Sequence, residues 1–206
     1  MPADGQDRPW HRGETDCMRA KAADGGEIAG EVCVLAGGRS RRMGRDKSRL
    51  QLGGETLLSH VVAGARGLGW PLRVIRRDRI RSCGPLSGVH CALDSTQSDR
   101  VLFLSCDMPF VSSRLLHELI LAGGSCAQAV FTRTSAGWGF PFLLCGVQAP
   151  WVRCQVEEGR RSLQEFADCL KANAFAVMPD DAWQLFNVNT PEDWEVARQI
   201  WHVKHG

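Results

Sequence analysis

The sequence predicts an α/β fold of three layers, in which a mostly parallel sheet carries helices on both faces. Strand-like and helix-like segments alternate along most of the 206 residues, as in proteins built from parallel strands and crossover helices. Two short runs, residues 31–35, which are apolar after Glu31, and residues 101–104, are typical of strands buried on both faces. Each run ends in a polar or glycine-rich turn. Because ligands of such sheets bind outside the carboxyl ends of the strands, we expect the functional site at these two turns.

The first half of the chain supplies three further elements. Residues 56–65 space apolar side chains at intervals of three and four, which predicts a helix packed on the sheet. A weaker strand pattern follows at residues 71–75. Residues 84–88, Gly-Pro-Leu-Ser-Gly, predict a turn, and a helix is expected to start within residues 89–93.

The second half continues the alternation. Residues 112–120 open with serines that can cap a helix and continue with helical spacing. The final helix is predicted to begin at Pro191, because proline and the acidic residues after it are favoured in a first helical turn. The remaining expected elements are strands at residues 127–132, 140–145 and 175–178, and helices at residues 161–170 and 191–201.

The composition limits the class of protein. A hydrophobic content of 44% is sufficient for the core of one domain, which we expect over residues 30–206 after a flexible tail of residues 1–29. A net charge of +2 gives no indication of a nucleic acid partner, and no apolar run approaches the roughly 20 residues needed to cross a membrane. The nine cysteines are odd in number and form no Cys-x-x-Cys pair, which favours reduced thiols in a cytoplasmic protein.

The first turn has the character of a phosphate-binding loop, Leu35-Ala-Gly-Gly-Arg-Ser-Arg-Arg-Met-Gly-Arg-Asp-Lys47. Gly37 and Gly38 allow the backbone to approach an anion closely and to direct N–H groups at it. Arg42 and Lys47 add a forked and a compact positive charge, so a triphosphate is the natural ligand. The spacing matches neither the P-loop nor the Gly-x-Gly-x-x-Gly motif. The alternative is a glycine turn with solvated arginines.

The second turn places Asp107 at the end of a buried strand. Magnesium prefers one or two carboxylates together with phosphate and water oxygens, so Asp107 is a candidate metal ligand. The alternative is an aspartate that caps the turn beside Pro109.

Two other sets of polar residues each allow two interpretations. Asn187 and Asn189 either contact a phosphate or sugar or fix the turn before the last helix. A cluster of arginines either attracts an anionic second substrate or forms a solvated face. The cluster consists of Arg73, Arg76, Arg77, Arg79 and Arg81.

The sequence of the phosphate-binding loop at residues 35–47, called the glycine loop from here on, resembles the signature of the MobA-type molybdenum cofactor guanylyltransferases. Three later stretches resemble the same family in the same order, so the resemblance extends over about residues 31–200: Gly84-Pro-Leu-Ser-Gly88, Cys106-Asp-Met-Pro109 and Asn187-Val-Asn-Thr-Pro-Glu192. The resemblance implies a Rossmann-like nucleotidyltransferase fold. It also implies attack by the terminal phosphate of molybdopterin, carrying molybdenum, on the α-phosphate of GTP, which releases pyrophosphate and forms the guanine dinucleotide cofactor.

The same resemblance implies roles for individual residues. Arg42, Lys47 and Asp107 would be the catalytic residues, with Asp107 acting through Mg²⁺. Asp78, one position from the aspartate of the family, is a further candidate for nucleotide contact. The full nucleotide-binding set is Leu35, Ala36, Gly37, Gly38, Lys47, Asp78, Gly84, Asp107, Asn187 and Asn189.

The chain departs from the family in two places. Only about 16 residues separate Gly67 from Gly84, where the family has two strands and an asparagine that contacts the nucleotide. The His-Pro motif of the family is replaced by Phe140-Pro141. Three alternatives therefore stay open: a cytidylyltransferase acting on the same cofactor, a transferase with another anionic acceptor, and a non-catalytic nucleotide-binding partner in molybdoenzyme maturation.

Overall fold

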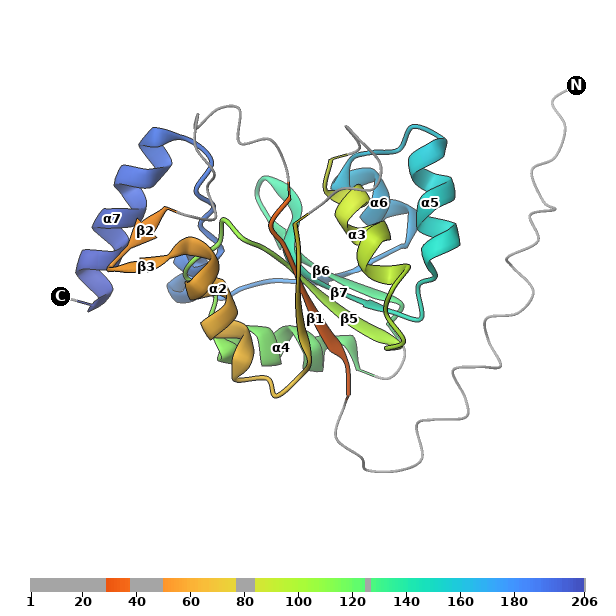
Figure 1. The fold of residues 1–206 in the computed structure, drawn as a ribbon, viewed down its shortest axis with the longest axis horizontal. Helices are drawn as coiled ribbons and strands as arrows, with labels where there is room; N and C mark the ends of the chain where they lie inside the picture. Colours follow the sequence, from red (N-terminus) through yellow and green to blue (C-terminus); the bar gives the residue numbers. More distant parts are fainter. Residues whose placement is uncertain (1–28, 38–49, 77–83, 125–126, 206) are drawn as a thin grey trace, which may run out of the picture.

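The computed structural model describes residues 29–37, 50–76, 84–124 and 127–205. Residues 1–28 of the predicted tail lie outside this part of the chain. The described residues form three layers, with a central sheet that has helices on both faces (Figure 1). The predicted fold class is therefore confirmed.

The central sheet has six strands in the order β4-β1-β5-β7-β6-β8. The strands are β1 (Glu31–Leu35), β4 (Leu72–Ile75), β5 (Arg100–Ser105), β6 (Ala129–Thr134), β7 (Gly137–Cys145) and β8 (Asn173–Phe175). β1 is parallel to β4 and β5, and β6 is parallel to β8, whereas β7 is antiparallel to both of its neighbours. The sheet is mostly parallel, and β1 and β5 consequently end at the same edge.

Helices cover the two faces of this sheet separately (Figure 1). α2 (Leu57–Arg66) and α4 (Ser113–Gly123) belong to one face, and α3 (Pro85–Leu93), α5 (Ala149–Glu157) and α6 (Leu163–Cys169) belong to the other. Val32 and Val34 belong to the first core, whereas Cys33 and Leu35 belong to the second. Both faces of β1 are thus buried, which explains its continuous apolar run.

A smaller unit packs beside the sheet. It contains β2 (Gln51–Leu52), β3 (Glu55–Thr56), the 3₁₀ helix η2 (Pro179–Leu185) and α7 (Pro191–His205). Its core includes Leu52, Phe110 and Ala197 together with the fully buried Val188. Val188 thereby anchors the segment between η2 and α7.

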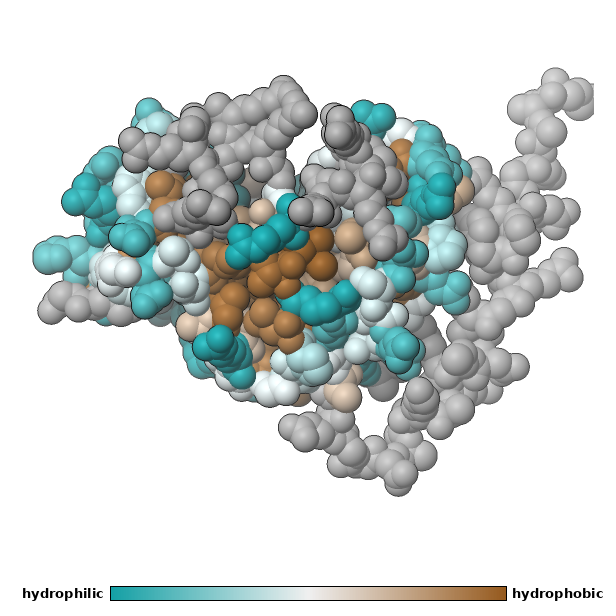
Figure 2. Space-filling model, viewed as in Figure 1, coloured by the Kyte–Doolittle hydropathy of each residue, from teal (hydrophilic) through white to brown (hydrophobic). Residues whose placement is uncertain are grey.

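Among the described residues, β4 is one of the two edge strands of the sheet, with β8 at the other side, and it pairs with β1 alone. Leu72 and Val74 of this strand are half-buried, as are Leu58 and Val62 of α2, and all four pack against the same core. Figure 2 shows apolar surface in this region, between α2 and β4. The strand pattern at residues 71–75 is weak because an edge strand is covered less completely than β1 or β5.

Several helix starts follow the sequence signals. Thr56 accepts the Ser59 N–H at 3.0 Å and caps α2, and Ser112 accepts the Leu115 N–H at 3.3 Å and caps α4. The predicted helices at both positions are confirmed. Among the described helices, none has the length and apolar character that a membrane span requires.

Two sequence-based expectations are corrected. Residues 85–88 do not form a turn but the start of α3, because Pro85 suits a first helical turn and Gly84, at φ +62°, redirects the chain before it. The strand expected at residues 175–178 lies earlier, at β8, where pairing with β6 fixes its position. The helix α5 was not predicted.

Candidate functional site

The carboxyl ends of β1 and β5 lie side by side. Leu35 is paired in register with Ser105, and the Cys106 N–H donates to the Leu35 carbonyl at 3.1 Å. The chain leaves β1 through Ala36, which is half-buried, and Gly37, which is exposed. The structure therefore brings the start of the glycine loop next to the turn that carries Asp107.

A third motif reaches the same place through the backbone. The Val188 N–H donates to the Asp107 carbonyl at 2.9 Å. Asn187, which is exposed, and Asn189, which is half-buried, flank this contact. Two segments separated by about 80 positions in the sequence are thus joined beside the half-buried Asp107.

The turn before α7 is fixed by a reciprocal capping box. Asp193 Oδ2 accepts the N–H groups of Asn189 and Thr190 at 2.8 and 2.9 Å, and Thr190 Oγ1 accepts the Asp193 N–H at 3.1 Å. This arrangement satisfies backbone donors at the start of the helix. The main-chain path of the Asn187–Asn189 segment is consequently held by Val188 and Asp193.

The amino end of α3 completes this edge. A Cβ atom on Gly88 would lie 3.1 Å from Leu35 Cδ2, so α3 packs closely on the end of β1. Gly84, the residue before this first turn, has no side chain that could cap it. The N–H groups of a first helical turn, together with the helix dipole, favour an anion. The Arg161 carbonyl also approaches, 3.3 Å from a Cβ built on Gly84, which brings the basic sequence Gly159-Arg-Arg to this edge.

The donor set at Asp107 suits one kind of cation. Within the described residues, no group of three or more His, Cys, Asp or Glu side chains could hold a metal by itself. The Asp107 carboxylate, completed by water and substrate oxygens, would be an all-oxygen donor set, which suits magnesium better than a structural zinc.

Several predicted site residues lie outside the part of the chain that the structure describes: Gly38, Arg42, Lys47 and Asp78. Of the arginine cluster, Arg77, Arg79 and Arg81 also lie outside it. Arg73 fits neither of the two interpretations for that cluster, because its guanidinium binds Glu31 at the opposite edge of the sheet.

A groove of about 490 Å³ lies elsewhere, between the β2–β3 hairpin and α7. Its lining includes Gln51, Gly53, Arg198, Trp201 and His202. None of the candidate residues lines it, so the groove is not the site that the motifs define.

The chain is similar to known proteins of one family. The chain matches the family described as MobA-like NTP transferase domain over residues 32–174. It is 33% identical over 202 residues to the molybdenum cofactor guanylyltransferase of Syntrophotalea carbinolica, with 82% of this chain and 91% of that protein covered.

Two further relatives differ in length and similarity. The chain is 30% identical over 189 residues to the molybdenum cofactor biosynthesis bifunctional protein of Synechocystis, covering 78% of this chain and 51% of that protein. The chain thus spans about half the length of this relative. Molybdopterin-guanine dinucleotide biosynthesis protein A from Archaeoglobus fulgidus has a similar fold, with a TM-score of 0.70 at 20% identity over 84% of this chain and 99% of that chain.

The family match extends from β1 to β8 and therefore includes nearly all of the six-stranded sheet, α3 and Asp107. The chain belongs to the MobA-like NTP transferase family and is a nucleotidyltransferase.

Proposed function

We propose that the protein transfers GMP from GTP to the molybdopterin-bound molybdenum cofactor in the cytoplasm, forming the guanine dinucleotide cofactor and pyrophosphate. One observation carries the proposal: backbone hydrogen bonds join the ends of β1 and β5 to the Asn187–Asn189 segment at one edge of the sheet. The name of the Syntrophotalea carbinolica relative supports guanylyl transfer. None of the six described cysteines forms a disulfide bond in the structure, which fits a reducing compartment.

The nucleotide would bind between the start of the glycine loop and the first turn of α3. The Ala36 N–H already donates to the Ile75 carbonyl at 2.8 Å, so the N–H groups from Gly37 onward and those of the first turn of α3 would receive the phosphates, as in other glycine loops and helix starts that bind anions. Arg42 and Lys47 would neutralise the triphosphate. Phosphoryl-type transfer depends mainly on positioning and charge neutralisation, so no side-chain nucleophile is required.

Asp107 would hold Mg²⁺ at this edge. When bound, the cation neutralises charge that develops on the phosphate oxygens. The hydrogen bond from the Val188 N–H holds the backbone of Asp107, which fixes the position from which its carboxylate side chain extends. Asn187 and Asn189, which flank Val188 in the sequence, would offer their side-chain amides to a phosphate or sugar. Asp78 remains a candidate contact for the nucleotide.

Pyrophosphate release with each of the four NTPs, in the presence of molybdopterin-bound molybdenum, tests the proposal. We expect release that depends on the acceptor and is fastest with GTP. Reactions without acceptor provide the control. Preference for CTP would replace the proposal with a cytidylyltransferase. Nucleotide binding without release, for all four NTPs, would indicate a non-catalytic partner in molybdoenzyme maturation.

A further inference from the structure

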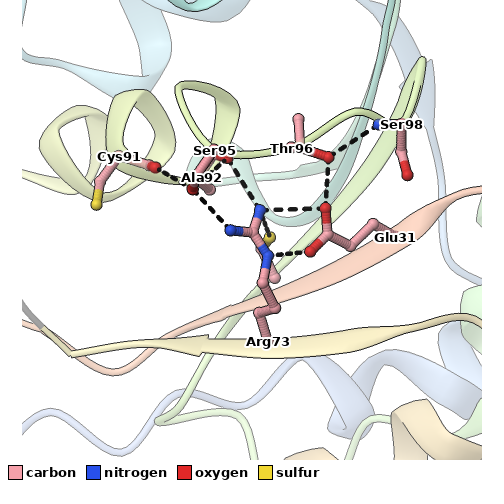
Figure 3. Close-up of polar contacts among 8 residues, drawn as sticks. Glu31, Arg73, Cys91, Ala92, Ser95, Thr96 and Ser98 are labelled. Carbon is pink, nitrogen blue, oxygen red and sulfur yellow. Dashed lines mark hydrogen bonds and ion pairs between the residues drawn. The ribbon is translucent and has the colours of Figure 1, made fainter.

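Polar side chains surround Arg73 at the amino edge of the sheet, the edge opposite Asp107 (Figure 3). The guanidinium donates to both carboxylate oxygens of Glu31, with Nη2 to Oε2 at 3.1 Å. It also donates to Ser95 Oγ at 2.7 Å and to the Ala92 carbonyl at 3.0 Å. The Thr96 hydroxyl donates to Glu31 as well. We call these five residues the Arg73 cluster.

The Arg73 cluster joins three elements. Glu31 is the first residue of β1, Arg73 lies in β4, and Ala92 lies in the last turn of α3. Glu31 is 6% exposed, and a buried carboxylate is tolerated when its charge and lone pairs are matched. The planar guanidinium can bind a carboxylate with two donors and still reach a helix carbonyl, which the single ammonium group of lysine cannot do.

The contact with Ala92 acts on the end of α3. The Ala92 carbonyl also accepts the Ser95 N–H at 3.2 Å and the Ser95 hydroxyl at 3.3 Å, so the guanidinium is an additional donor that ties this carbonyl to β4, and a cation is favourable at this end of a helix because of the helix dipole. α3 faces the sheet mainly with apolar residues such as Leu86 and Val89, and apolar contacts are not directional. The directional hydrogen bond from Arg73 therefore helps to set the position of α3 along its own axis.

The other end of the same helix forms the candidate nucleotide site. Ala92 is about 10 Å from Pro85 by the rise of an α-helix, and Gly84 contributes no side-chain cap. The close contact between Gly88 and Leu35 leaves little free space between α3 and β1. A displacement of α3 along its axis would therefore move Leu35 or separate the first turn of α3 from the glycine loop.

We propose that Arg73 is a positioning residue for nucleotide binding, although it lies at the far edge of the sheet and touches no substrate. By fixing the carboxyl end of α3 to β1 and β4, it sets the separation between the first turn of α3 and the end of β1. This inference rests on the proposed function, since it requires that the nucleotide binds at the Asp107 edge.

Calorimetric titration with GTP and Mg²⁺ tests the inference on the full chain. We would compare the unaltered protein with Arg73→Lys, Arg73→Met and Glu31→Gln. Leu119→Ala is the matched control, because Leu119 is fully buried in α4 on the opposite face of the sheet and its loss lowers stability without touching α3. All titrations are made well below the melting temperature of each variant.

We expect Arg73→Met to raise the Kd for GTP about tenfold, because displacements near 1 Å have effects of up to about 10²-fold in enzymes. Arg73→Lys should bind GTP more tightly than Arg73→Met but less tightly than the unaltered chain, whereas Leu119→Ala should bind GTP normally despite its lower melting temperature. If Arg73→Met does not fold, the Kd of Arg73→Lys tests the inference in its place.

Normal GTP affinity in the folded Arg73 variants would overturn this inference alone, and so would an equal loss of affinity in Leu119→Ala, since a purely structural role predicts that the variants behave alike. If the unaltered chain binds CTP in place of GTP, the same titrations are made with CTP. If it binds no nucleotide, the proposed function fails, and the inference fails with it.

Discussion

Replacing Asp107 with asparagine changes the charge of the candidate site and leaves its backbone contacts in place. The bond from the Val188 N–H to the Asp107 carbonyl, at 2.9 Å, and the bond from the Cys106 N–H to Leu35, at 3.1 Å, both use main-chain atoms. The side chain is half-buried, so its loss exposes no apolar core. We therefore expect Asp107→Asn to fold with nearly unchanged stability.

The size of the effect expected for Asp107→Asn on GTP binding and transfer follows from the position of the Asp107 carboxylate. At a partly buried site, with an effective dielectric constant of about 20, unit charges about 4 Å apart interact by about 4 kcal/mol. Without magnesium, Asp107 repels a triphosphate, so Asp107→Asn should bind GTP at least as tightly as the unaltered chain. With magnesium, the carboxylate attracts the cation that bridges it to the phosphates. The rate of transfer should therefore fall about 10²–10³-fold in the variant, as for removal of other electrostatic groups.

Calorimetric titration with GTP, in magnesium and in EDTA, measures this coupling directly. The Kd for GTP in EDTA divided by the Kd for GTP in magnesium should be large for the unaltered chain and close to one for Asp107→Asn. Asp99→Asn is the matched control, because Asp99 is exposed and lies about 20 Å away, before the start of β5. If magnesium tightens GTP binding equally in both variants, Asp107 is not the metal ligand.

Three predictions concern stability. Gly64→Ala would place a Cβ atom 2.2 Å from the Val111 carbonyl oxygen, so urea unfolding should show a loss of about 2–3 kcal/mol. Gly139→Ala has no atom within 4 Å of the new Cβ and should change little; equal effects would contradict the packing argument. Asp193→Ala removes the acceptor of two N–H groups before α7 and should cost about 1–2 kcal/mol, whereas Asp193→Asn should recover part of it. A neutral result for Asp193→Ala would show that the capping box contributes nothing. Burial raises the pKa of the Cys33 thiol from 9.0 to about 12, so above pH 9 the unfolded chain releases a proton that the folded chain retains. The free energy of unfolding should consequently fall as pH rises above 9, and it should fall less steeply in Cys33→Ala; parallel slopes would refute the assignment.

The central layers of the fold could be read from the sequence because their signals are local. The apolar runs of β1 and β5 need no partner to be recognised, and Thr56 and Ser112 mark helix starts through contacts three residues away. The glycine loop and Asp107 were found for the same reason, since both follow a buried strand directly. The turn predicted at residues 84–88 was wrong over residues 85–88, because Pro85 and Gly88 are turn residues in isolation, whereas packing of Gly88 on Leu35 favours a helix there.

What the sequence determined by itself was the fold class, the order of most elements and the motifs that identify the family. The tertiary structure alone decided which of these motifs meet, because the bonds that join Leu35 to Cys106 and Asp107 to Val188 connect backbone groups far apart in the chain and leave no trace in residue type. It also decided the contacts of Arg73. In the sequence Arg73 belongs to a run of arginines. Only the packing of β1 and α3 beside β4 brings its guanidinium to Glu31 and to the last turn of α3. Local patterns specify elements, whereas contacts between distant segments depend on how those elements pack.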